Sequence, residues 1–100
     1  MRVFIREDLG TAFPGTVRAG RSGLRWHRTW SLPERRIRWS QVRSCTVAPD
    51  RRPGVLRHTI RLVVEFDDGL LEMMLRGPLG ALALAELRDT IRVAADLPHA

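Results

Sequence analysis

The stretch from His58 to Leu75 constrains the fold most, because apolar residues recur at every second position along each of its two halves. A period of two places alternate side chains on opposite faces of a β-strand, so one face of each segment is expected to be buried. Asp68-Gly69 interrupts the pattern with a dipeptide that favours tight hairpin turns. The sequence therefore predicts a β-hairpin. Its inner lining would consist of Ile60, Leu62, Val64, Phe66, Leu71, Met73 and Leu75.

The parity of these positions also predicts the register of the hairpin. A two-residue turn at Asp68-Gly69 would pair Phe66 with Leu71 and Val64 with Met73, which puts all four side chains on one face. The same register places Glu65 opposite Glu72, which is tolerable on the solvent side or beside an arginine.

The segment that follows predicts a helix over residues 78–97. Pro78 suits a first helical turn, and the next proline is Pro98. At 100° per residue the apolar residues cover a broad arc, which comprises Leu79, Leu82, Ala83, Leu84, Leu87, Ile91, Val93, Ala94 and Leu97. Arg88, Asp89, Arg92 and Asp96 lie opposite, and Arg92 and Asp96 are spaced to pair. Such a broad arc indicates either deep packing against a sheet or a surface shared with a second chain. The self-association candidates are Leu82, Glu86 and Val93.

The first half of the chain reads as short strands separated by breaks at residues 13–15, 20–23, 31–34 and 49–54. Strands are predicted near Val3–Ile5, Thr16–Arg18, Leu24–Trp30, Arg36–Trp39 and Ser44–Val47. With the later hairpin this gives about seven strands before one helix. The expected fold is a mainly β, α+β single domain over residues 1–100, a curved antiparallel sheet or small barrel capped by the C-terminal helix.

The basic character of the chain is concentrated in its first part. The net charge is +6, and all 17 basic residues are arginine. Lysine, asparagine and tyrosine are absent. A GC-rich bacterial genome would give this composition regardless of what the protein binds, so the total charge alone says little about the partner. Residues 1–57 hold 13 arginines against four acids, whereas residues 58–100 hold four arginines against seven acids.

The arginines between residues 18 and 43 are the candidates for binding an anionic partner, because guanidinium groups grip phosphate and carboxylate well. They are Arg18, Arg21, Arg25, Arg36, Arg38 and Arg43. Interleaved tryptophans could stack on bases, but parity places Trp26, Trp30 and Trp39 in the core. Three interpretations stay open: a solvated basic face over a tryptophan-rich core, an anion-binding surface, and a base-stacking surface. Arg28 shares the parity of Trp26, which indicates a bulge or argues against that strand.

The sequence shows no recognisable catalytic or metal-binding arrangement. Cys45 lacks a local nucleophile signature with His27, His58 or His99, and a buried, inert thiol is expected. The histidines lack metal-ligand spacing, and no phosphate-binding glycine loop is present. We expect no enzyme activity, no cofactor, no metal and no small-molecule substrate.

Two segments, Arg36-Ile37-Arg38-Trp39-Ser40-Gln41-Val42 and Val64-Glu65-Phe66-Asp67-Asp68-Gly69, precede the final helix. In this order, over residues 15–97, they resemble bacterial pleckstrin-homology-like (PH-like) domains. The resemblance implies a non-enzymatic scaffold that binds peptides, lipids or copies of itself. In lipid-binding members the basic residues sit at the first hairpin, which would correspond to Arg18, Arg21 and Arg25. The chain departs from the family outline in lacking a tryptophan in the last helix and attached membrane-spanning helices.

These features together predict a PH-like scaffold that acts through protein contacts and self-associates. The alternative is binding of an anionic ligand, nucleic acid or acidic lipid, through the arginine-rich half. No apolar run reaches the roughly 20 residues needed to span a bilayer. A cytoplasmic location is expected, or a peripheral one at the membrane.

Overall fold

The computed structural model describes residues 1–29, 33–50 and 59–97. They form one seven-stranded antiparallel sheet in the order β4-β3-β2-β1-β7-β6-β5, followed by one helix. The strands are β1 (Arg2–Glu7), β2 (Phe13–Ala19), β3 (Gly23–Arg28), β4 (Arg35–Arg38), β5 (Val42–Pro49), β6 (Thr59–Phe66) and β7 (Gly69–Arg76). A 3₁₀ turn, η1 (Trp39–Gln41), joins β4 to β5, and α1 spans Gly77–Ala94. The predicted mainly β, α+β class with a terminal helix is confirmed.

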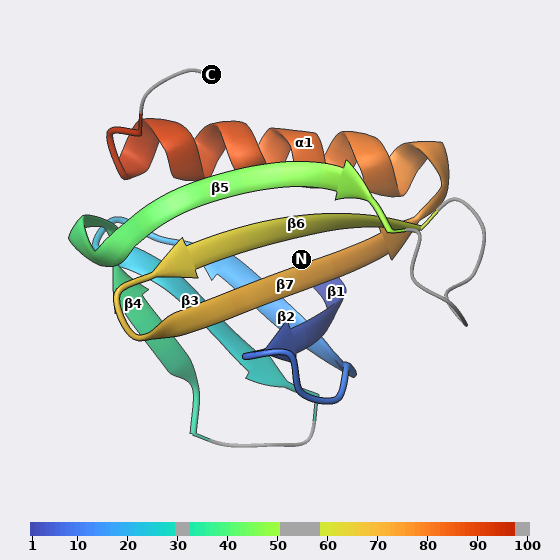
Figure 1. Ribbon diagram of the computed structural model, residues 1–100, viewed down its shortest axis with the longest axis horizontal. Coiled ribbons are helices and arrows are strands. Elements are labelled where there is room, and N and C mark those ends of the chain that lie inside the picture. The colour runs from blue at the N-terminus through green and yellow to red at the C-terminus, as the bar shows by residue number, and fades with distance from the viewer. Residues whose placement is uncertain (30–32, 51–58, 98–100) are drawn as a thin grey trace.

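Strand β1 joins the two halves of the sheet. Its beginning pairs with β2, from Arg2 opposite Thr16, and its end pairs with β7, as far as Glu7 opposite Leu71. The strands β2–β4 and β5–β7 therefore cross each other at an angle, with α1 running beside β5 (Figure 1). Because β4 and β5 end the strand order without pairing to each other, the sheet is curved but not closed.

The concave face of the sheet carries the core, together with one side of α1. Leu62, Val64, Leu71 and Met73 are fully buried there, and Ile60, Phe66 and Leu75 pack around them partly exposed. The predicted inner lining of the hairpin is thus confirmed at all seven positions. Tryptophan burial is confirmed for Trp26, which is 2% exposed, and for Trp39, which packs against the core. Trp30 lies outside the described residues.

The predicted hairpin register is wrong by two residues. Phe66 lies opposite Gly69 and Val64 opposite Leu71, so the turn is formed by Asp67 and Asp68. A shift of two keeps every side chain on its predicted face. It also separates the two acids that were expected to face each other, since Glu65 pairs with Leu70 and Glu72 with Val63.

Contacts with β1 explain this register. The backbone N–H of Leu70 donates to the Asp8 carboxylate over 2.8 Å, and the Asp8 N–H donates to the Leu70 carbonyl over 2.9 Å. A Cβ on Gly69 would lie 2.6 Å from that carboxylate, so a glycine is needed here for close approach. Its role in the fold is this tertiary contact.

Helix α1 ends three residues before the predicted boundary. Asp96 adopts a left-handed conformation, with φ of 54°. The N–H of Leu97 bonds to the carbonyl of Arg92 and that of Asp96 to the carbonyl of Val93, which is the Schellman pattern of helix termination. Arg92 donates its Nε to the Cys45 carbonyl over 3.0 Å at the β5 edge, in place of the expected pairing with Asp96.

Two further predictions about the first half need correction. The break predicted at residues 13–15 lies inside β2, where Pro14 pairs with Phe4 and Gly15 with Arg28. The strand predicted to reach Trp39 ends at Arg38. Arg28, whose parity conflicted with a buried strand face, ends β3 and is exposed, with its guanidinium 3.8 Å from the centre of the Phe13 ring.

Within residues 1–29, 33–50 and 59–97, no helix is both long and apolar enough to cross a bilayer.

Candidate anion-binding face

Three arginines from three neighbouring strands lie side by side on the outer, convex face of the sheet. Arg18 of β2 lies opposite Arg25 of β3, and Arg25 lies opposite Arg36 of β4. Residues directly opposite each other on paired strands point to the same face, with Cβ atoms about 5 Å apart. We call Arg18, Arg25 and Arg36 the arginine row.

The rest of the outer face of β1–β4 is also basic. Alternation along the strands adds further outward residues, namely Arg2, Phe4 and Arg6 of β1, Pro14 and Thr16 of β2, His27 of β3 and Arg38 of β4. The register aligns Arg2 with Thr16 and Thr16 with His27. Glu7 is the only acid within these four strands, and it has the parity of the buried Val3 and Ile5. We refer to this surface as the outer β1–β4 face.

Interactions of Glu7 hold it away from the outer β1–β4 face. The indole N–H of Trp26 donates to Glu7 Oε1 over 2.6 Å, and Arg35 approaches the same oxygen at 3.5 Å. Within the described part of the chain, none of the arginine row, Arg2 or Arg38 forms an ion pair. Like charges placed directly opposite on adjacent strands destabilise a sheet. The arginine row therefore has an unfavourable electrostatic energy that a bound anion would relieve.

A small polar hollow lies where the arginine row reaches the β4 edge. It has a volume of about 280 Å³, and Arg25, Arg36 and Arg38 line it together with Ser22 and Gln41. Gln41 is fixed there because its Oε1 accepts the backbone N–H of Arg38 over 2.8 Å. Three arginines that line one hollow of this size supply enough guanidinium groups to bind one phosphate or carboxylate group.

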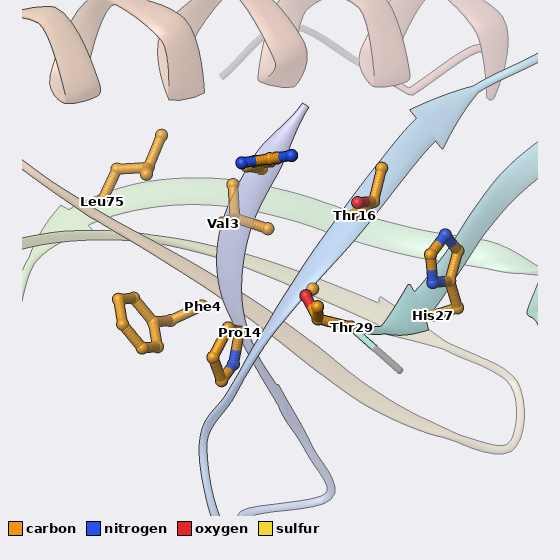
Figure 2. Close-up of a pocket in the computed structure, with 9 residues that line it drawn as sticks. Val3, Phe4, Pro14, Thr16, His27, Thr29 and Leu75 are labelled. Atoms are coloured by element: carbon orange, nitrogen blue, oxygen red, sulfur yellow. The ribbon is translucent and has the colours of Figure 1, made fainter. Parts of the chain in front are cut away.

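A larger hollow opens beside the outer β1–β4 face, next to the point where the pairing of β1 with β7 ends at Phe4 and Met74, with a volume of about 640 Å³. Arg2, Val3, Phe4, Pro14, Gly15, Thr16, His27, Thr29 and Leu75 line it. In Figure 2 the Phe4 ring lies beside Pro14, and His27 lies on the far side of Thr16 and Thr29. Phe4 is 54% exposed, which is unusual for a strand phenylalanine.

The structure brings together only part of the predicted anion-binding set. Arg18, Arg25, Arg36 and Arg38 share the outer β1–β4 face, and Arg21 is exposed in the turn between β2 and β3. Arg43 lies on β5 at the other end of the strand order, and its Nε bonds to Asp67 Oδ1 over 2.5 Å. A binding role for any of them stays a prediction.

The correspondence drawn with the first hairpin of lipid-binding PH-like domains is wrong for this chain. Arg18, Arg21 and Arg25 lie at the hairpin between β2 and β3, which is the second one. The first hairpin joins β1 to β2 through residues 8–12, which contain Asp8 and no arginine.

Sequence reasoning also missed the contribution of β1, although a signal was present. Arg2, Phe4 and Arg6 alternate with the apolar Val3 and Ile5, so their common outward parity was readable. Their position beside the arginines of β2 and β3 depends on strand pairing, which the alternation does not reveal.

The thiol of Cys45 is buried on the core side of β5, as predicted. It is 1% exposed, and burial raises the pKa of the thiol from 9.0 to about 11, against the opposing effect of Arg92 and Arg88. A thiol that ionises so late is a poor nucleophile near neutral pH. His27 points from the opposite, outer face of the sheet, and His58 and His99 lie outside the described residues. Among the side chains that the structure places, no group of three or more His, Cys, Asp or Glu is arranged to hold a metal ion.

The predicted self-association residues lie on the solvent side of α1. Leu84, Leu87 and Ile91 are buried against the sheet, whereas Leu82 is 57% and Val93 75% exposed. Glu86 is exposed between them, and Leu79 extends the same side toward the start of the helix. We call Leu79, Leu82, Glu86 and Val93 the outer stripe of α1. The broad apolar arc thus does not reflect deep packing.

The strand order and the capping helix are those expected of a PH-like fold. Searches of protein-family models, curated proteins and solved structures find no match for the chain.

Proposed function

We propose that this chain is a non-catalytic PH-like binding module that holds a phosphate-rich partner on the outer β1–β4 face. The observation that carries the proposal is the arginine row, which places Arg18, Arg25 and Arg36 side by side without an acid on that face. A genomic bias toward arginine explains how many arginines the chain has. It does not explain why those of three neighbouring strands gather on one face with no acid among the outward residues of these strands.

The PH-like assignment is supported by the strand order, by the late hairpin and by the helix that covers the core from one side. The uncovered convex face of β1–β4 is then the surface left free for a partner. Such folds host many functions, so the function must be argued from this surface and not from the fold.

A titration with inorganic polyphosphate tests the proposal, with the bound fraction followed by tryptophan fluorescence or by calorimetry. The test variant is the double substitution Arg25→Gln and Arg36→Gln. A matched control removes the same charge elsewhere, through Arg43→Gln and Arg88→Gln, whose guanidinium groups face Asp67 and Asp89.

We expect the test variant to bind polyphosphate at least about tenfold more weakly, with a salt dependence reduced by roughly one to two phosphate contacts. The control should change affinity by no more than about twofold. Equal losses in both variants would mean that only net charge matters, and no binding at low salt would also defeat the proposal.

A second function, self-association through the outer stripe of α1, is favoured by the exposure of Leu79 and Val93, which are 82% and 75% exposed. Apolar side chains gathered on one helix side are typical of protein contact surfaces. Analytical ultracentrifugation over a range of concentrations tests it, with Leu82→Glu as the disrupting change and Thr46→Glu on exposed β5 as the control. A strict monomer at the highest soluble concentration would exclude this function.

A further inference from the structure

The outer β1–β4 face offers an exposed aromatic ring as well as positive charge. Phe4 lies at the middle of β1, with Pro14 opposite on β2 and Met74 opposite on β7. Its cross-strand neighbours leave 54% of its surface exposed. Exposing a phenylalanine at a strand centre costs free energy relative to a polar residue, so its ring is a candidate for partner contact.

The large hollow beside Phe4 has the size of a small-molecule or nucleobase site, at about 640 Å³. Its lining is mixed. Apolar surface comes from Val3, Phe4, Pro14 and Leu75, while Thr16, Thr29 and His27 supply groups that can hydrogen-bond. Arg2 contributes a guanidinium to the same hollow. An aromatic base that also carries hydrogen-bonding edges fits such a lining better than an acyl chain does.

The arginine row begins two residues along β2 and β3 from residues that line this hollow. Arg18 follows Thr16 by two residues on β2, and Arg25 precedes His27 by two on β3. Two residues of a strand span about 6.6 Å. One nucleotide chain can therefore place a base in the hollow and its neighbouring phosphates on the arginine row. Proteins that bind single strands combine a basic track with aromatic side chains on which bases stack.

We infer that the phosphate-rich partner is single-stranded nucleic acid, with one base stacked on Phe4 and the backbone phosphates lying along Arg18, Arg25 and Arg36. This inference rests on the proposed function and adds the class of ligand to it. In a duplex the bases are stacked on each other and cannot reach the ring, so paired strands offer only their phosphates. Binding to an acidic membrane would be favoured by several inserted apolar side chains, but among the described residues of β1–β4 Phe4 is the only large hydrophobic residue exposed on this face.

The test measures the affinity of the protein for three probes at low salt. Labelled oligodeoxythymidylate and an abasic oligonucleotide of equal length are compared by fluorescence anisotropy, and inorganic polyphosphate is compared with both by competition. The variants are Phe4→Leu, which keeps an apolar side chain without a ring, and Phe4→Trp, which keeps the ring. Leu82→Ala on α1 is the control for loss of an exposed apolar residue. Since Phe4 is half exposed, these variants are expected to fold, and thermal unfolding verifies it.

Phe4→Leu should weaken binding of oligodeoxythymidylate by about five- to 150-fold, the range that corresponds to the loss of one stacked base. Binding of polyphosphate should stay within about twofold, and Phe4→Trp should retain or strengthen oligonucleotide binding.

Several outcomes would overturn the inference while leaving the proposed function intact. These are equal affinity for the thymidylate and abasic oligonucleotides, an equal effect of Phe4→Leu on oligonucleotide and polyphosphate, and preference for a matched duplex. Sedimentation with phosphatidylserine vesicles without oligonucleotide binding would do the same. A protein that binds neither polyphosphate nor oligonucleotide would overturn both proposals.

Discussion

Arg61 donates a hydrogen bond from Nη1 to the carboxylate of Glu72 over 2.8 Å, on the outer side of the sheet where β6 pairs with β7. The Glu72 side chain is completely buried, and its other oxygen lies 3.5 Å from Nε of Arg6 without a hydrogen bond. A buried carboxylate is tolerable only when it is paired, because an isolated charge loses its hydration. Arg6 and Arg61 thus hold an acid inside the junction of β1, β7 and β6.

We predict that Arg61→Leu lowers the free energy of unfolding by about 3 kcal/mol, because it leaves a buried charge without its hydrogen-bonded partner. Arg6→Leu should cost less, since its contact with Glu72 lacks hydrogen-bond geometry. The control is Arg43→Leu, which breaks an exposed pair with Asp67 and should cost less than about 1 kcal/mol. Urea unfolding measures all three, and similar costs for Arg61→Leu and Arg43→Leu would contradict this account.

The alternation of apolar residues predicted the faces of the strands but not how the strands align. The seven alternating apolar residues between Ile60 and Leu75 lie on the core side as expected, yet the hairpin register is displaced by two residues. Displacement by two leaves each side chain on its face, so hydrophobic pattern cannot detect it. The register depends instead on Asp8, whose partner Leu70 is 62 residues away in the sequence.

The candidate site was predictable to a similar degree. The sequence named Arg18, Arg25, Arg36 and Arg38 among its candidate arginines, and the structure places all four on one face. Their alignment across three strands depends on pairing that no local pattern specifies.

The predicted end of the helix was wrong for a local reason, because Asp96 terminates α1 in a conformation that glycine adopts far more readily than aspartate.

A second prediction concerns alkaline pH. Because burial raises the pKa of Cys45 to about 11, the thiol ionises in the unfolded chain near 9.0 but stays neutral in the folded one. Stability should therefore be lost as pH rises from about 9 to 11, by roughly 2 kcal/mol in total.

The composition leaves few other groups that titrate in this pH window, since the chain has neither lysine nor tyrosine. Urea unfolding of Cys45→Ala should show no such decline between these pH values, although the substitution lowers stability at every pH by leaving a small cavity. Parallel curves for the two proteins would refute the assignment of the decline to Cys45.

A third prediction separates function from stability on the outer β1–β4 face. Arg25 is the middle member of the arginine row, flanked by Arg18 and Arg36. Arg25→Gln should raise the free energy of unfolding by about 0.2–1 kcal/mol, because it removes two like-charge contacts. The gain should shrink as salt screens the row.

Arg43→Gln serves as the comparison, since it removes an arginine that has an acidic partner and should bring no gain. Thermal unfolding at low and high salt measures both. A variant Arg25→Gln that is less stable than the parent at low salt would show that the row is not under electrostatic strain.

The last prediction concerns the end of α1. Asp96 has a φ of 54°, in the left-handed region where side chains are disfavoured and glycine is not. Its backbone N–H completes the terminating hydrogen bond to the Val93 carbonyl, so the conformation is fixed by the helix end. Asp96→Gly should therefore raise the free energy of unfolding by about 0.5–1 kcal/mol.

Asp89→Gly provides the matched control inside the same helix, at an exposed position with ordinary helical geometry. There glycine adds backbone entropy and removes the exposed pair with Arg88, so the change should lower stability by roughly 0.5–1 kcal/mol. Both substitutions replace aspartate by glycine and differ mainly in backbone conformation, so opposite signs in urea unfolding would locate the helix end. If both were destabilising to the same extent, residue 96 would lie within a continuing helix and the terminus would have to be moved toward Leu97.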